Sequence, residues 1–134
     1  MPLCADRNGK LASSVAGLAN WASDTSNGFT RGIMQSTLGI DKNAALPKYQ
    51  SKTLVKRAAE TPLEINTAAP AYGRKAVIYA TCFGNYNNPA TGEATRKVLA
   101  KNGIETEVVY PGCGGMPLME QGDVAAVAEN AKKV

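Results

Sequence analysis

Residues 73–134 alternate short apolar runs with segments of helical periodicity, and this alternation constrains the fold more than any other feature of the sequence. Within the segment 75–81, residues 76–80 are continuously apolar, which is typical of a strand buried on both faces of a parallel sheet. A second strand is expected at 104–110, and helical patterns follow the two runs at 89–101 and 124–134. The order strand, helix, strand, helix predicts an α/β fold with a partial parallel, Rossmann-like sheet.

The first half of the chain has a different pattern. Stripes of apolar residues predict helices over 10–22 and 29–40, and a third helix is expected over 51–60, before a proline-containing linker. We therefore divide the chain into a helical linker or docking segment, 1–72, and a partial α/β domain, 73–134.

The predicted sheet is unusually small. Two strands do not form a stable parallel sheet by themselves. We expect the α/β unit to continue in a longer natural protein or to be completed by another chain, and the lack of a stop signal after the last helical segment favours truncation. On the helix over 89–101, we expect Ala94, Val98 and Leu99 to face inward.

Composition excludes several classes of protein. The chain has no histidine, which excludes Ser-His and Cys-His nucleophile pairs and two-histidine zinc sites. Neither a signal peptide nor an apolar run long enough to span a bilayer is recognisable. The most basic stretch, from Lys48 to Arg57, contains one aromatic residue, and we interpret it as a solvated helix face rather than a nucleic-acid site. Three cysteines, an odd number, argue against a disulfide-stapled secreted domain and favour the cytoplasm.

Cys82 and Cys113 are the candidate site residues, because they follow the two predicted strands. A right-handed crossover makes these strands parallel, so both thiols reach the sheet edge where α/β proteins bind ligands. Glycines around Cys113 allow the backbone to approach a bound group. We predict that the two cysteines bind a metal or an iron–sulfur cluster; the simpler alternative is a pair of buried free thiols. Cys4 lies in an irregular segment and is assigned no such role.

Two other chemistries fit the sequence poorly. A phosphatase-type loop needs an arginine six positions after its cysteine, and Asn88 stands there instead. The glycine-rich segment 112–115 has neither the spacing of a dinucleotide-binding fingerprint nor the lysine of a P-loop.

Residues 80–89 and 113–123 resemble the cysteine-rich CCG domain found in heterodisulfide reductase and in the iron–sulfur subunit of anaerobic glycerol-3-phosphate dehydrogenase. Upstream segments, among them 18–21 and 46–49, look like the region before this domain in the glycerol-3-phosphate dehydrogenase branch. The resemblance implies that Cys82 is the first cluster ligand and that Cys113 is the first cysteine of a Cys-Cys-Gly motif. Gly114 stands where the second cysteine of that motif is expected, and later cysteines of the motif do not occur in this sequence. Because clusters usually take four thiolates, we do not expect this chain to hold a complete one by itself.

The function that the resemblance implies is electron transfer. The chain would be an iron–sulfur subunit of an anaerobic oxidoreductase, or a fragment of one. It would relay electrons from a flavin dehydrogenase partner toward a membrane quinone pool, at the cytoplasmic face of the membrane, without being catalytic itself. Two alternatives stay open. One is a non-redox interaction module whose sheet is completed by a partner or by self-association. The other is a zinc–thiolate site that joins Cys82 and Cys113 to ligands from another copy.

Overall fold

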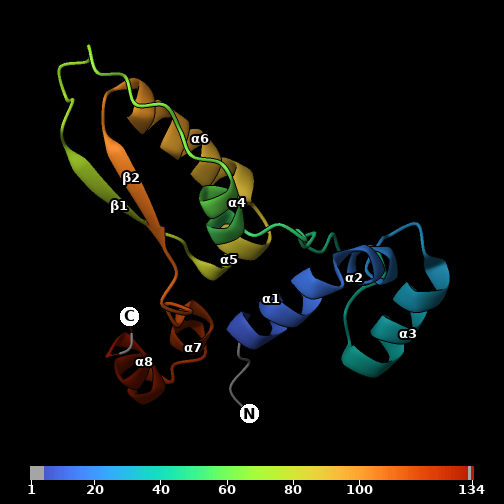
Figure 1. Ribbon diagram of the computed structural model, residues 1–134. Coiled ribbons are helices and arrows are strands. Elements are labelled where there is room, and N and C mark those ends of the chain that lie inside the picture. The colour runs from blue at the N-terminus through green and yellow to red at the C-terminus, as the bar shows by residue number, and fades with distance from the viewer. Residues whose placement is uncertain (1–4, 133) are drawn as a thin grey trace.

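The structure is a computed structural model that describes residues 5–132 and Val134, so Cys4 lies outside the described residues. Eight helices and two strands occur in the described part of the chain (Figure 1). In chain order they are α1 (Ala5–Ser14), α2 (Ala16–Ala22), α3 (Gly28–Leu38), α4 (Leu54–Glu60), β1 (Lys75–Tyr79), α5 (Cys82–Tyr86), α6 (Pro89–Lys101), β2 (Glu105–Val109), α7 (Met116–Glu120) and α8 (Val124–Ala131). This order confirms the predicted α/β class.

The two strands form a parallel sheet, as predicted. Their register runs from Lys75 opposite Glu105 to Tyr79 opposite Val109. Helices α4 and α6 pack on the sheet through β2 (Figure 1). The expectation that the first strand is buried on both faces is wrong for the described residues, since Val77 is 64% exposed. The face of β1 that carries Val77 is therefore apolar but is not covered by other described residues.

Helix α6 shows how packing overrides an apolar pattern. It begins at Pro89 and is followed by Gly103 with a φ of 84°, as the Asn-Pro and Asn-Gly pairs predict. Its inward face, however, carries Gly92, Arg96 and Ala100, which are spaced four residues apart. A Cβ at Gly92 would lie 2.2 Å from the Leu54 side chain, so this face must stay small where α4 crosses it.

Because α6 turns that face toward α4, the prediction for its inward residues is mostly wrong. Ala94 and Val98 are exposed, and Leu99 is half-buried.

The first half of the chain differs from expectation in two of its three predicted helices. The helix predicted over 10–22 is two helices, α1 and α2, separated at Val15, whose φ of −121° and ψ of 37° are not helical. Helix α3 ends before Gly39, which adopts a left-handed φ of 70°. The third helix starts later than expected, at Leu54, because the Thr53 side chain accepts a hydrogen bond from the Lys56 N–H and caps it there.

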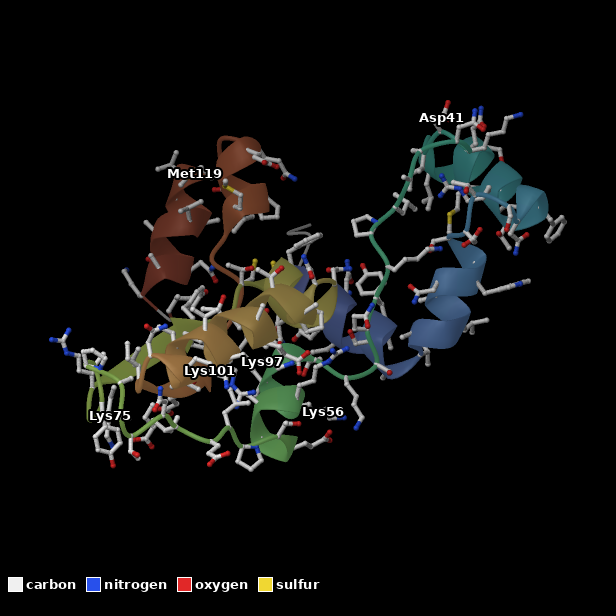
Figure 2. All side chains as sticks on the ribbon, turned by 90° about the horizontal axis from the view of Figure 1, so that it is seen from above. Asp41, Lys56, Lys75, Lys97, Lys101 and Met119 are labelled. Atoms are coloured by element: carbon white, nitrogen blue, oxygen red, sulfur yellow. The ribbon has the colours of Figure 1, made fainter. Side chains whose placement is uncertain are left out.

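These helices make unequal contacts with the α/β half. Helix α1 packs against α5, and α4 packs against α5, α6 and β2, whereas α2 and α3 extend away from the sheet (Figure 1). In Figure 2, Asp41 marks the tip beyond α3, and Lys56, Lys97 and Lys101 lie on the other side of the molecule from Met119 of α7. No described helix is both long enough and apolar enough to cross a bilayer.

The basic stretch from Lys48 to Arg57 is largely paired with carboxylates. Lys48 contacts Asp24 at 2.7 Å, and Arg57 contacts Glu93 at 3.0 Å. A third pair, Lys52 with Glu60, is 2.8 Å apart. Three of the four positive charges in this stretch thus have an internal partner.

Candidate functional site

Cys82 is placed at the start of a short helix. The last ladder hydrogen bond of the sheet runs from the Ala80 N–H to the Val109 carbonyl at 2.9 Å, and the chain turns directly after it. The Thr81 side chain then caps α5 by accepting a hydrogen bond from the Gly84 N–H at 3.0 Å. This five-residue helix was not predicted, although a threonine just after a strand is a recognisable cap signal.

Cys113 lies in the loop between β2 and α7, and neighbouring elements hold that loop in place. The Tyr79 hydroxyl of β1 donates a hydrogen bond to the Gly112 carbonyl at 2.9 Å. The Asn130 side-chain amide of α8 donates a hydrogen bond to the Cys113 carbonyl. The Gly115 N–H points at the Cys113 sulfur from 3.5 Å. Both strand β1 and the last helix therefore contribute to fixing Cys113.

The two thiols lie next to each other. Their Sγ atoms are 3.8 Å apart, and both residues are half-buried. This distance is far longer than the roughly 2.05 Å of a disulfide bond, so both thiols are free. Burial raises the pKa of the Cys82 thiol, and the neighbouring Cys113 raises this pKa further. The structure thus brings together the two residues that the sequence singled out, while their role as ligands stays a prediction.

The donor set around these thiols is too small for a complete metal site. Within residues 5–132, no group of three or more histidine, cysteine, aspartate or glutamate side chains could hold a metal ion. An iron–sulfur cluster usually takes four thiolates, and a structural zinc ion takes four ligands. Cys82 and Cys113 therefore do not complete either site by themselves.

A small cavity opens beside Cys82. It has a volume of about 360 Å³, and Cys82 is one of the residues that line it. Two hollows of about 650 Å³ lie elsewhere, one beside α6 and one beside α2. The residues that line the cavity at Cys82 come from α1, α5, α7 and the segments near them: Asn8, Gly9, Tyr49, Cys82, Phe83, Tyr86, Asn87 and Pro117.

A polar cluster behind this cavity joins α1 to the α/β half. Asp6 Oδ1 accepts hydrogen bonds from the hydroxyls of Tyr86, at 2.9 Å, and Tyr110, at 2.8 Å. The two tyrosine rings meet edge to face, with centroids 5.5 Å apart. Burial raises the pKa of Asp6, but hydrogen bonds from Tyr110, Lys10 and Tyr86 outweigh it, and the net pKa is lowered. Sequence reasoning missed this cluster because Asp6 is 80 residues from Tyr86 along the chain.

Comparison with known proteins finds a family match that includes this site. Residues 76–134 match the family model of the cysteine-rich domain CCG. This part of the chain is similar to CCG domains. The match runs from β1 to the last residue and includes both Cys82 and Cys113, which confirms the resemblance found from sequence. CCG domains are typical of the subunits of iron–sulfur oxidoreductases. No solved structure matches the chain significantly.

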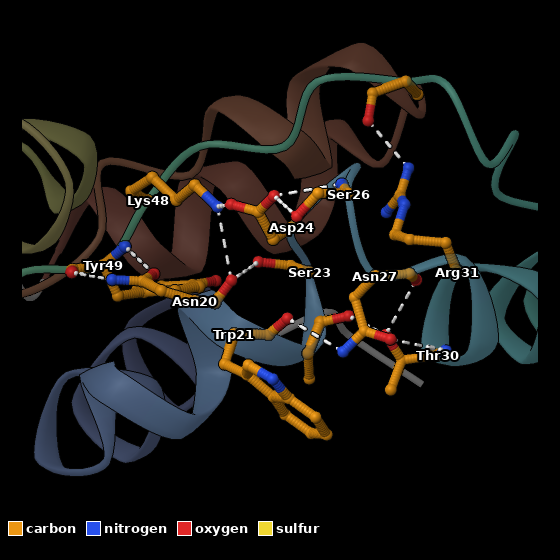
Figure 3. A network of polar contacts seen from close by, with 12 residues as sticks. Asn20, Trp21, Ser23, Asp24, Ser26, Asn27, Thr30, Arg31, Lys48 and Tyr49 are labelled. Atoms are coloured by element: carbon orange, nitrogen blue, oxygen red, sulfur yellow. Dashed lines mark hydrogen bonds and ion pairs between the residues drawn. The ribbon is translucent and has the colours of Figure 1, made fainter.

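The segments upstream of the CCG domain contain a second network of polar contacts (Figure 3). The Asn20 side chain pairs with the Tyr49 backbone through two hydrogen bonds of 2.8 Å, one to its carbonyl and one from its N–H. Lys48 also donates a hydrogen bond to the Asn20 carbonyl, at 3.2 Å. The upstream segments 18–21 and 46–49 thus contact each other, and they fix α2 to the extended chain before α4.

Proposed function

We propose that this chain is part of an iron–sulfur electron-transfer subunit of an anaerobic oxidoreductase, similar to the iron–sulfur subunit of anaerobic glycerol-3-phosphate dehydrogenase. The observation that supports the proposal is the pair of thiols, 3.8 Å apart, at the carboxyl edge of a CCG domain. On this proposal Cys82 and Cys113 supply two of about four thiolates. The other ligands come from a second chain or from further parts of the same protein.

The chain's own contribution is to position these two sulfurs. The cap at Thr81 and the hydrogen bonds to the loop around Cys113 fix the two backbones. A cluster, when bound, would supply one-electron transfer, and hydrogen bonds to sulfur would tune its potential. The Gly115 N–H is already directed at the Cys113 sulfur. Because the residues present do not complete a cluster, we assign no reaction step to it.

A redox partner would approach over the apolar side chains near the thiols. Phe83, Met116 and Met119 are all exposed on α5 and α7. Exposed aromatic and methionine side chains are common in the cores of protein interfaces. We therefore propose that a flavin dehydrogenase docks at this edge of the sheet and passes electrons through this chain toward a membrane quinone pool, with the assembly at the cytoplasmic face of the membrane.

The test is anaerobic reconstitution of the reduced full chain with iron and sulfide. We expect iron-dependent visible absorbance that is lost in Cys82→Ser and in Cys113→Ser and is kept in the matched control Cys4→Ser. At most about one cluster for every two chains is expected, because two chains together supply four of these thiolates. A folded chain that stays colourless, with no more iron than the Cys82→Ser variant, contradicts the proposal that these two thiols bind a cluster between copies of this chain. Metal analysis that finds zinc and no iron supports the zinc–thiolate alternative instead.

The open face of the sheet favours a second candidate, an interaction module completed by self-association. Val77 is exposed on β1, and each strand of the two-stranded sheet has one edge without a strand partner among the described residues. Light scattering during size-exclusion chromatography tests it. We expect a concentration-dependent dimer that Val77→Asp weakens, whereas the exposed control Val98→Asp on α6 leaves it unchanged. A monomer at every concentration excludes this candidate.

A further inference from the structure

Cys82 and Cys113 lack the partners for a metal site, but they need no third group to form a bond with each other. We propose that these two residues form a reversible intramolecular disulfide, which gives the chain a two-electron thiol–disulfide couple of its own. This inference goes beyond the proposed electron-transfer function and does not require a cluster. It follows from the distance between the thiols, the freedom of the loop around Cys113 and the access to Cys82.

The distance requires only a small movement. The sulfurs are 3.8 Å apart, so each has to move by about 0.9 Å to reach the roughly 2.05 Å of a disulfide. Neighbouring parallel strands are about 4.8 Å apart, which lies in the range of Cα separations that disulfides span, about 4.4–6.8 Å. β1 and β2 are adjacent and parallel, and Cys82 and Cys113 follow the last paired residues of the two strands, Tyr79 and Val109, by three and four positions.

The loop around Cys113 has room to make the movement. Glycines precede and follow the cysteine, at positions 112 and 114. A Cβ built at Gly112 would meet no heavy atom within 4 Å, and one at Gly114 would meet only the Tyr79 hydroxyl oxygen, at 3.7 Å. Hydrogen bonds from Tyr79 and Asn130 hold the loop carbonyls, but the space beside the two glycines leaves room for the Cys113 side chain to shift. Cys82, in contrast, lies in the regular helix α5.

The cavity of about 360 Å³ at Cys82 gives a small disulfide access to that thiol. The Cys82 thiolate attacks one sulfur of a low-molecular-weight disulfide, forms a mixed disulfide and releases the first thiol. The Cys113 thiolate then attacks the Cys82 sulfur, forms the Cys82–Cys113 bond and releases the second thiol. Two protein thiols lose two electrons and two protons in total, and the small disulfide is reduced to two thiols. Excess small thiol reverses both steps.

The experiment titrates the metal-free full chain in mixtures of oxidised and reduced glutathione and maps disulfides by mass spectrometry without reduction. We expect one intramolecular disulfide, between Cys82 and Cys113, and its loss in excess reduced glutathione. The Cys4→Ser chain should form the same bond, which controls for the third cysteine. Both thiols remaining reduced in oxidised glutathione, while circular dichroism shows a folded chain, overturns the inference. So does a bond that involves Cys4 in place of either residue.

Variants that keep only one of the two site cysteines, both made in the Cys4→Ser chain, test the route of entry. Cys113→Ser should keep a stable glutathione adduct at Cys82, because the second attack is blocked, and its adduct should form several times faster than the adduct at Cys113 in Cys82→Ser. Equal rates, or a faster adduct at Cys113, overturn entry through the cavity. The outcome of the disulfide experiment can be distinguished from the outcome of the iron reconstitution. A chain that forms the disulfide and binds no iron contradicts only the proposed function, and a chain that binds iron and never forms the disulfide contradicts only this inference.

Discussion

The helices α2 and α3 and the α/β half of the molecule are held together in different ways. In the α/β half, Ala80 is buried, and the buried Leu54 of α4 packs directly onto Gly92 of α6. In α2 and α3 the large apolar side chains are exposed, including Phe29 at 78%, and the most deeply buried side chain is Arg31, at 1%. Apolar packing therefore specifies one region, and polar contacts specify the other.

Each region nevertheless uses a buried arginine to hold loop carbonyls. The Arg31 guanidinium donates hydrogen bonds to the carbonyls of Asp41, Lys42 and Ala44, at 2.7–3.1 Å. Arg96 donates hydrogen bonds to the carbonyls of Ala58 and Thr61, at 3.3 and 3.0 Å. Apolar packing supports the buried arginine of α6 but not the buried arginine of α3. We infer that α3 and its loop open at a lower free energy than the sheet, because little apolar surface is lost to water when they do.

The largest effect is expected at Gly103 of the α/β half, which lies directly against the backbone of Tyr72. A Cβ there would lie 2.8 Å from backbone atoms of Tyr72, and the φ of 84° disfavours other residues. Gly103→Ala should lower the free energy of unfolding by about 3 kcal/mol, from the left-handed conformation and overpacking together. Urea denaturation measures it. The matched control is Gly39→Ala, which has a similar φ of 70° and no heavy atom within 4 Å. It should cost only about 1 kcal/mol, and equal losses would contradict the packing difference between the regions.

A smaller and more local effect is expected at Arg31. Arg31→Met removes the donors to three carbonyls and should destabilise the α3 region by about 2 kcal/mol. Hydrogen exchange should show faster exchange over residues 28–44, while β1 and β2 keep their protection. Arg31→Lys retains a cation but has fewer donors. Its exchange rates over residues 28–44 should lie between those of the unchanged chain and those of Arg31→Met. If the strands lose protection as much as α3 does, the two regions unfold as one unit and the comparison fails.

The junction between the regions should respond to acid through Asp6. Its pKa is lower in the folded chain, so its contribution to stability is fully present above the unfolded value of about 3.9 and is lost as the pH falls through the folded value. Asp6→Asn should cost about 1 kcal/mol at neutral pH and should flatten the decline of stability below pH 4. Melting temperatures from pH 2 to 7 measure both. The double variant Asp6→Asn/Tyr110→Phe should lose less stability than the sum of the losses in the two single variants. Strict additivity would show that the hydrogen bond between Asp6 and Tyr110 contributes nothing to stability.

The sequence predicted the features that local signals control. The strand order placed Cys82 and Cys113 at one edge, and the helix predicted over 89–101 has the bounds of α6. The inward face of α6 was missed because it consists of Gly92, Arg96 and Ala100, which an apolar pattern does not select. The Asp6 contacts were missed because they join residues 80 and 104 positions apart. Whether the two thiols bind a cluster depends on groups outside the described residues, and it stays a prediction.

The smallest effect on stability, and the sharpest test of the site, is expected at Gly114. Unlike Gly103, it is exposed, and a Cβ there meets only the Tyr79 hydroxyl oxygen, at 3.7 Å. Gly114→Cys should therefore change the free energy of unfolding by no more than about 0.5 kcal/mol. It adds a third thiol beside Cys113, so more iron per chain should remain bound after anaerobic reconstitution and desalting.

Gly114→Ser is the matched control, since it adds a side chain of similar size without a strong iron ligand. An equal gain in bound iron for Ser would assign the effect to the loop backbone rather than to ligand number. A large loss of stability in both variants would show that Gly114 is as tightly constrained as Gly103. If instead the cysteine variant binds iron and the serine variant does not, the glycine is a missing ligand in an otherwise permissive loop. The packing of the α/β half would then fix Cys82 firmly while leaving the Cys113 side of the site free to vary.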